Sequence, residues 1–318
     1  MEQLDRLDVA DPAAGSTQRL QSGLAFALAS AAAFGLSGPI ASGLFGAGWT
    51  AGTSVLVRVS IAAAVLVVPG LLAVRGRWGA LVDAAPTILL YGALAVAGAQ
   101  LCYFYAVTSL DVGVALLIEY LAPVAVVVWM WLRKGQRPGA LTVLGAAVAA
   151  VGLVLLLDVL GGGSLSVEGV LWALGAMVGA ATYFVVSADD SLGLPPITLA
   201  AGGLTVGAAV LGLAGLAGIL PMAATTAPVE YAPFTVPWWV PVVALGAVTA
   251  AFAYVTGIAA SRRLGSRLAS FVALVEVMAA IVFAWLLLDQ VPAALQLLGA
   301  ALVLAGVVVV KLGGPSTV

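Results

Sequence analysis

Long apolar runs, separated by short polar or turn-forming segments, recur along almost the whole chain. Each run approaches the roughly 20 residues that an α-helix needs to cross the hydrocarbon core of a bilayer. Read against the turn signals, the runs predict an all-α integral membrane protein of ten transmembrane helices. The predicted spans are 21–44, 51–73, 86–107, 113–132, 140–157, 169–187, 196–220, 238–260, 268–288 and 293–311.

The composition agrees with this pattern. Of the 318 residues, 63% are hydrophobic and only 8% are charged, whereas a soluble domain carries about a quarter charged residues to wet its surface. The lipid bilayer is therefore the expected surrounding of this chain. Residues 1–20 are polar and lack the basic n-region of a signal peptide, so we expect a disordered cytoplasmic tail and a first helix that is retained.

Basic residues fall on one side of the predicted helices. If the N-terminus is cytoplasmic, eleven of the twelve Lys and Arg residues lie in inner segments, and the twelfth, Arg58, lies within a span. The positive-inside rule then predicts a multi-pass protein of the cell (cytoplasmic) membrane with both termini in the cytoplasm. The inner residues are Arg6, Arg19, Arg75, Arg77, Arg133, Lys134, Arg137, Arg262, Arg263, Arg267 and Lys311.

The second half of the chain repeats the first at an offset of 154 residues. Trp131-Leu132 then falls on Trp285-Leu286, and Leu144-Gly145-Ala146-Ala147 on Leu298-Gly299-Ala300-Ala301. Five spans per repeat is an odd number, so the two repeats must cross the membrane in opposite senses, an arrangement that recurs in secondary transporters. The predicted organisation is a tail (1–20), repeat 1 (21–157), a periplasmic linker (158–168), repeat 2 (169–311) and a cytoplasmic C-tail (312–318).

Several motifs resemble those of the drug/metabolite transporter superfamily, specifically its EamA-type ten-helix members. The matching stretches are Val57-Arg58-Val59, Glu119-Tyr120-Leu121-Ala122-Pro123-Val124, Val275-Glu276 and Ala284-Trp285-Leu286-Leu287-Leu288-Asp289-Gln290. The Glu119 stretch is similar to that of threonine/homoserine exporters. The chain departs from the family pattern at Asp289-Gln290, usually Gly-Glu, and at Glu276-Val277, often Glu-Pro. The resemblance implies export of small metabolites, commonly amino acids or related amphiphilic compounds and drugs, through a central cavity lined by both halves.

Three ionisable residues lie well inside predicted spans, where a charge is costly: Arg58, Glu119 and Glu276. Arg58 and Glu119 are each about 10 Å below the outer surface, so they can meet at one depth. They form either a structural salt bridge or a site in which Glu119 faces the cavity and Arg58 tunes it or holds a substrate carboxylate. Glu276 has no basic partner at its depth, and it is either a proton carrier or a protonated group bonded to a neighbouring helix.

Other polar and aromatic residues in the spans are candidates for the lining of a cavity. Pro123 lies one turn after Glu119 and leaves the carbonyl of Glu119 without its usual donor, which marks either a binding site or a packing kink. Any single aromatic residue is also compatible with an ordinary place in the core or against lipid. The further candidates are Gln100, Tyr103, Tyr120, Trp172, Tyr183 and Tyr254.

These residues favour a secondary transporter over an enzyme. The chain has no histidine, only one cysteine (Cys102), and neither a metal-ligand cluster nor a nucleotide-binding loop. We therefore expect no catalytic residue, no metal, no cofactor and no nucleic-acid partner. The predicted function is proton-coupled export of a small-molecule substrate by alternating access, by a monomer or homodimer. An uncoupled facilitator of the same fold, or a membrane-embedded enzyme, is the alternative.

Overall fold

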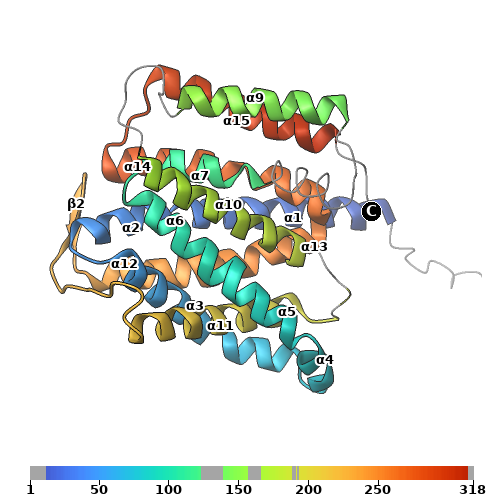
Figure 1. Ribbon diagram of the computed structural model, residues 1–318. Helices are drawn as coiled ribbons and strands as arrows, with labels where there is room; N and C mark the ends of the chain where they lie inside the picture. Colours follow the sequence, from blue (N-terminus) through green and yellow to red (C-terminus); the bar gives the residue numbers. More distant parts are fainter. Residues whose placement is uncertain (1–11, 123–138, 157–165, 188–190, 192, 314–318) are drawn as a thin grey trace, which may run out of the picture.

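The computed structural model describes residues 12–122, 139–156, 166–187, 191 and 193–313, and these residues are mostly helical (Figure 1). The first half contains α1 (Pro12–Gly35), α2 (Ser37–Gly46), α3 (Ala51–Ala73), α4 (Trp78–Asp83), α5 (Ala85–Leu90), the π-helix η1 (Tyr91–Gly98), α6 (Ala99–Val107), α7 (Val112–Glu119) and α9 (Ala140–Leu156). The second half contains α10 (Val167–Ser187), α11 (Pro196–Leu216), β1 (Val229–Tyr231), β2 (Phe234–Val236), α12 (Trp239–Val243), the π-helix η3 (Ala244–Phe252), α13 (Ala253–Val272), α14 (Val275–Leu288) and α15 (Ala294–Gly313).

Most of the predicted spans have a helical counterpart. Among the described residues, six helical stretches are long and apolar enough to cross a bilayer: Leu20–Gly46, Ala51–Ala73, Ala85–Val107, Val167–Ser187, Pro196–Leu216 and Trp239–Leu264. Shorter apolar helices at Ala140–Leu155, Val275–Leu288 and Ala294–Val310 correspond to the fifth, ninth and tenth predicted spans. Only the beginning of the fourth, α7, lies within the described residues. The chain is thus a helical protein with several apolar spans, and the number ten stays a prediction.

Two boundaries differ from the sequence prediction. α1 begins at Pro12, so described residues that we expected to be a disordered tail form a helical extension of the first span. α13 continues through Arg262 and Arg263, where the sequence predicted a break, and ends at Val272 inside the predicted ninth span. Arginine is a good helix former. A pair of arginines therefore does not by itself end a helix, even where it lies at the expected end of a membrane span.

The helices pack in layers (Figure 1). α9 and α15 run side by side along one edge, and α7 and α14 lie next to them. α3 packs against α11 at the opposite edge, while α1 against α13 and α6 against α10 fill the middle. The largest fully buried side chains, among them Leu44, Leu117 and Leu204, belong to helices other than α9 and α15. α9 and α15 are therefore a peripheral pair.

Glycines allow α9 and α15 to touch backbone to backbone. A Cβ built on Gly145 would lie 2.7 Å from the carbonyl oxygen of Gly306, and one built on Gly152 would lie 2.7 Å from that of Gly299. With the 154-residue offset, Gly145 falls on Gly299 and Gly152 on Gly306. Each repeat thus presents the same two glycines to the other, in the reciprocal manner of a two-fold interface.

Further irregular features occur at equivalent places in the two halves. At the same offset, η1 falls on 245–252, which lies within η3. Tyr120, which caps the end of α7, falls on Leu274, which precedes α14. The fourth and ninth predicted spans are therefore both interrupted, and at matching positions.

The two ends of the helix bundle are closed differently. At one end, the connection before α12 carries the β1–β2 hairpin, which lies across the end of α2 (Figure 1). The hydroxyl of Tyr231 donates to the carbonyl of Ile40 at 3.0 Å, and the amide of Ala232 donates to the carbonyl of Leu287 at 2.8 Å. At the other end, Arg77 and Arg262 donate to Gly193 and Leu194. The hairpin ties α2 to α14, and basic residues gather at the opposite end.

Candidate functional site

A cavity lies between helices of both halves. Its volume is about 80 Å³. One water molecule needs about 10–15 Å³ on this scale, so the cavity has room for several waters or a small solute. It is lined by Phe34, Ala95, Ala99, Gln100, Glu119, Tyr120, Ala180, Tyr183, Tyr254 and Glu276.

Small residues create this space. Ala95 and Ala99 come from η1 and α6, and Ala180 comes from α10. α6 and α10 approach closely, because a Cβ on Gly179 would lie 2.4 Å from that of Ala99. Short side chains bring the two backbones together and leave open volume beside the contact, as is common between membrane helices.

The interruptions of the two broken helices place both carboxylates at the cavity. Glu119 is the last residue of α7, and Glu276 lies in the first turn of α14. Transporters use broken helices at binding sites, because the ends expose backbone groups and orient side chains toward a central ligand. The two glutamates, which lie 157 positions apart in the sequence, are thereby brought to one space.

The sequence suggested that Glu276 has no basic partner, but in the structure it accepts a hydrogen bond. The hydroxyl of Tyr120 donates to Glu276 Oε2 at 2.7 Å. Glu119 lines the same cavity. Matching depths along the helices gave no basic partner for Glu276. The partner is instead the phenol of Tyr120, which lies at the end of α7 in the other repeat.

The side chain of Arg58 bonds to groups other than Glu119, its partner in the salt bridge that was one of the two alternatives from the sequence. Its side chain is 1% exposed. One Nη donates to Gln100 Oε1, and the other donates to the carbonyl oxygen of Thr249 at 2.7 Å. The guanidinium also lies 5.6 Å from the centre of the Phe104 ring. Within the described part of the chain, Arg58 is held by neutral groups and stands behind Gln100 instead of lining the cavity.

Gln100 connects Arg58 to the cavity. Since its Oε1 accepts from Arg58, its amide N–H groups are left for the cavity side, where Tyr254 is a hydrogen-bonding neighbour. The carbonyl that receives the second bond from Arg58 belongs to η3, a π-helical segment of a kind often found at functional sites. Arg58 therefore fixes the orientation of an amide that lines the cavity.

Aromatic rings form another part of the cavity wall. The ring centres of Phe34 and Tyr254 are 5.2 Å apart, and those of Tyr183 and Tyr254 are 6.0 Å apart, both in edge-to-face geometry. Phe34 was not among the sequence candidates, since an apolar aromatic in a span has no distinguishing signature. It is placed beside Glu276 because a Cβ on Gly35 would lie 3.0 Å from the carbonyl of Glu276, so α1 and α14 are in contact.

The ten candidates from the sequence do not all lie at the cavity. Glu119, Glu276, Gln100, Tyr120, Tyr183 and Tyr254 line the cavity, and Arg58 contacts it through Gln100. Tyr103 instead packs against α2, where its hydroxyl would lie 2.4 Å from a Cβ on Gly38, and Trp172 stacks on Tyr105 with centres 4.7 Å apart, outside the lining. Pro123 lies outside the described residues.

Comparisons with known proteins agree with this architecture. One solved structure, titled only "Crystal structure of protein", matches over 93% of this chain and 97% of its own, with a TM-score of 0.57 and 23% sequence identity. At that identity the match speaks for the fold alone. No curated protein matches. The EamA-like transporter family matches twice, over residues 21–158 and 167–312. Since the two matches cover most of the chain and coincide with the two repeats, this multi-pass membrane protein belongs to the EamA-like transporter family, within the drug/metabolite transporter superfamily.

Proposed function

We propose that the protein is a secondary transporter that exports a small amphiphilic metabolite, such as an amino acid or a related compound, across the cytoplasmic membrane. The single observation that carries the proposal is a cavity between the two repeats that holds two carboxylates, an oriented amide and aromatic rings. Such a mixture suits a solute with both polar and apolar parts. Export as the direction rests on the resemblance to the family.

Alternating access is supported by the reciprocal contacts between the repeats. The glycine pairs of α9 and α15, the two π-helices and the two interrupted spans occupy equivalent positions. Two similar units in opposite orientations offer two states of comparable energy that open to opposite sides. The clustering of Arg77 and Arg262 at the end away from the hairpin supports a cytoplasmic location for that end.

Proton coupling is supported by the charges around the cavity. Among the described residues around the cavity, Arg58 carries one positive charge and two ionised glutamates carry two negative ones, which leaves an excess of one negative charge in a buried place. An uncompensated buried charge is costly. Either one proton or the ammonium group of a substrate removes the excess, so the two compete. Competition of this kind makes the protein an exchanger of protons for substrate.

A substrate with an ammonium and a carboxylate group fits the arrangement. The ammonium group would lie between Glu119 and Glu276, close to the faces of aromatic rings that favour cations. The carboxylate would accept from the amide of Gln100, whose orientation Arg58 fixes. The apolar part would lie against Phe34 and Ala95.

Transport into proteoliposomes under an imposed pH gradient tests the proposal, with candidate amino acids chosen by profiling the medium of cells that express or lack the protein. We expect gradient-driven uptake by the wild type and its loss in Glu276→Gln and Glu119→Gln. Glu230→Gln is the matched control, since Glu230 is exposed on the hairpin. Wild-type uptake that does not depend on the pH gradient would show that the protein is an uncoupled facilitator. Unchanged gradient dependence in both cavity variants would show that Glu119 and Glu276 do not carry the proton.

A further inference from the structure

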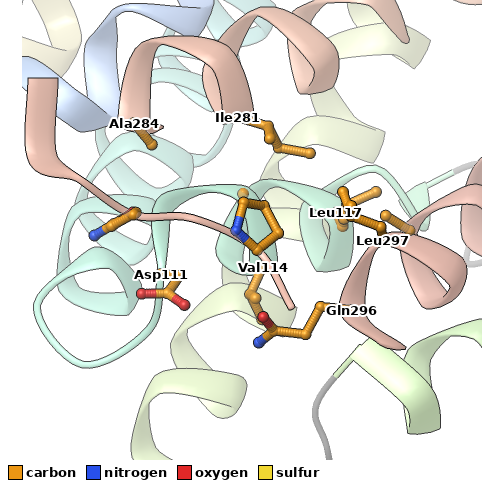
Figure 2. Close-up of a pocket in the computed structure, with 11 residues that line it drawn as sticks. Asp111, Val114, Leu117, Ile281, Ala284, Gln296 and Leu297 are labelled. Atoms are coloured by element: carbon orange, nitrogen blue, oxygen red, sulfur yellow. The ribbon is translucent and has the colours of Figure 1, made fainter. Parts of the chain in front are cut away.

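A second hollow lies at the perimeter of the molecule, in the seam between the α9–α15 pair and the rest (Figure 2). It is formed by α7, α14, α15 and the connection between the last two. α15 contacts α7 only over a short stretch, so the seam is left partly open. Figure 2 shows side chains from these helices facing one space. They are Asp111, Gly113, Val114, Leu117, Ile281, Ala284, Gln290, Pro292, Gln296, Leu297 and Ala300.

The polarity of this groove changes along its length. Asp111 precedes α7, and Gln290 lies in the connection that follows α14, so both are at the ends of apolar helices, at the depth where a span leaves the hydrocarbon. Leu117 lies six residues further along α7, which corresponds to about 9 Å of helix. Val114, Leu117 and Leu297 make the inner wall apolar. The groove is therefore polar at the membrane surface and apolar below it.

The polar groups at the rim have unused hydrogen-bonding capacity. Gln290 Oε1 accepts from the amide of Val112 at 3.3 Å, and Gln296 Oε1 accepts from the amide of Ala293 at 2.9 Å. The side-chain N–H groups of Gln290 and Gln296 are therefore free to donate, and in the described part of the chain they have no hydrogen-bond acceptor. The exposed carboxylate of Asp111 likewise has no hydrogen bond or ion pair among the described residues.

We propose that this groove binds one phospholipid with a primary ammonium headgroup. The carboxylate of Asp111 would hold the ammonium group, the amides of Gln290 and Gln296 would donate to phosphate or ester oxygens, and one acyl chain would lie against the exposed side of Leu297. Leu297 is half exposed on the lipid-facing side, so a bilayer lipid reaches the groove without entering the protein. The bound lipid fills the seam and joins the α9–α15 pair to α7 and α14.

Native mass spectrometry of the purified protein, with phosphatidylethanolamine, phosphatidylcholine or phosphatidylglycerol added in turn, tests this site. We expect retention of the first lipid to exceed that of the other two, and Asp111→Asn to weaken it about three- to fivefold, the range for an exposed ion pair. Asp289→Asn is the matched control, because Asp289 is an exposed carboxylate of the same connection that does not line the groove, and Asn tolerates its positive φ of 54°.

A second variant tests the acyl-chain wall separately. Leu297→Trp fills the groove from the lipid side and should reduce retention of all three lipids, while the elution profile in size-exclusion chromatography stays that of the wild type. Equal retention of the three lipids by the wild type, or an unchanged affinity for phosphatidylethanolamine in Asp111→Asn, would overturn the proposal. Neither result depends on transport activity, so the site stands or falls independently of the proposed function.

Discussion

The contact between α9 and α15 makes a quantitative prediction about Gly306. A methyl group at this position, introduced as Gly306→Ala, would lie 2.5 Å from the backbone nitrogen of Ala149 and 2.6 Å from the carbonyl oxygen of Gly145. Ordinary contacts begin at 3.4 Å. The two helices must therefore move apart by roughly 0.9 Å, because the obstructing atoms are backbone and have no rotamer to change. A gap of this size costs a quarter to a half of each affected dispersion contact.

Two terms of opposite sign decide the net effect on stability. Overpacking costs about 1–3 kcal/mol, whereas replacing glycine by alanine inside a helix stabilises by about 1 kcal/mol. Since the clash involves backbone on the facing helix, we expect the first term to dominate and Gly306→Ala to destabilise the protein by up to about 2 kcal/mol. At Gly212 the balance is reversed, because the nearest atom to a new Cβ is a side-chain carbon of Leu56 at 3.8 Å. Gly212→Ala should leave stability unchanged or raise it.

Thermal unfolding of the detergent-solubilised variants measures this difference. Gly306→Ala should melt below the wild type and Gly212→Ala at or above it. Gly152→Ala should resemble Gly306→Ala, because a Cβ there would lie 2.6 Å from the nitrogen of Val303. The double variant should lose less than the sum of the two, since the first substitution already separates the helices. If Gly306→Ala melted as high as Gly212→Ala, the close backbone contact would be refuted.

Two further predictions concern the cavity and the hairpin. Tyr120→Phe removes the hydroxyl that donates to Glu276 at 2.7 Å; a bond to a charged group is worth about 1.5–3 kcal/mol, so initial uptake into proteoliposomes should fall at least tenfold, whereas Tyr105→Phe, outside the cavity lining, should transport normally. Equal rates in the two variants would show that the Tyr120 bond has no role. Gly43→Ala places a Cβ 2.3 Å from the ring of Tyr231 and should loosen the hairpin, seen as faster limited proteolysis, whereas Gly46→Ala has no neighbour within 4 Å and should not. Identical digestion of both would mean that Tyr231 does not anchor the hairpin.

The sequence identified most of the cavity because a bilayer makes polar side chains conspicuous. Glu119, Glu276 and Gln100 stand out in apolar helices, and a polar group retained there usually faces the protein interior. Aromatic residues are less informative, because the same ring serves in a cavity, in the core or against lipid. Tyr183 lines the cavity, whereas Trp172 stacks on Tyr105 outside it.

What the sequence could not provide was the rotation of each helix about its axis. Arg58 and Glu119 were predicted to meet because they share a depth, but depth alone does not say which way a side chain points. In the structure the guanidinium of Arg58 points toward Gln100 and donates to its side chain, and it donates a second hydrogen bond to the backbone carbonyl of Thr249. A main-chain acceptor has no signature in the sequence, so the bonding partners of Arg58 could not be predicted from it.

The two repeats match in backbone but differ in the charges that they bring to the cavity. The interruption after Glu119 and the one before Glu276 are equivalent, yet Glu119 falls on Ala273 at the 154-residue offset, and Glu276 falls on Ala122. One carboxylate thus precedes its break and the other follows it. If both halves carried a carboxylate at the same position, the cavity would present the same groups to both sides of the membrane. The inward-open and outward-open states would then have the same chemistry. In the proposed mechanism, the repeated backbone would supply two exchangeable conformations, and the unequal side chains would let a proton and a substrate be handled differently in each.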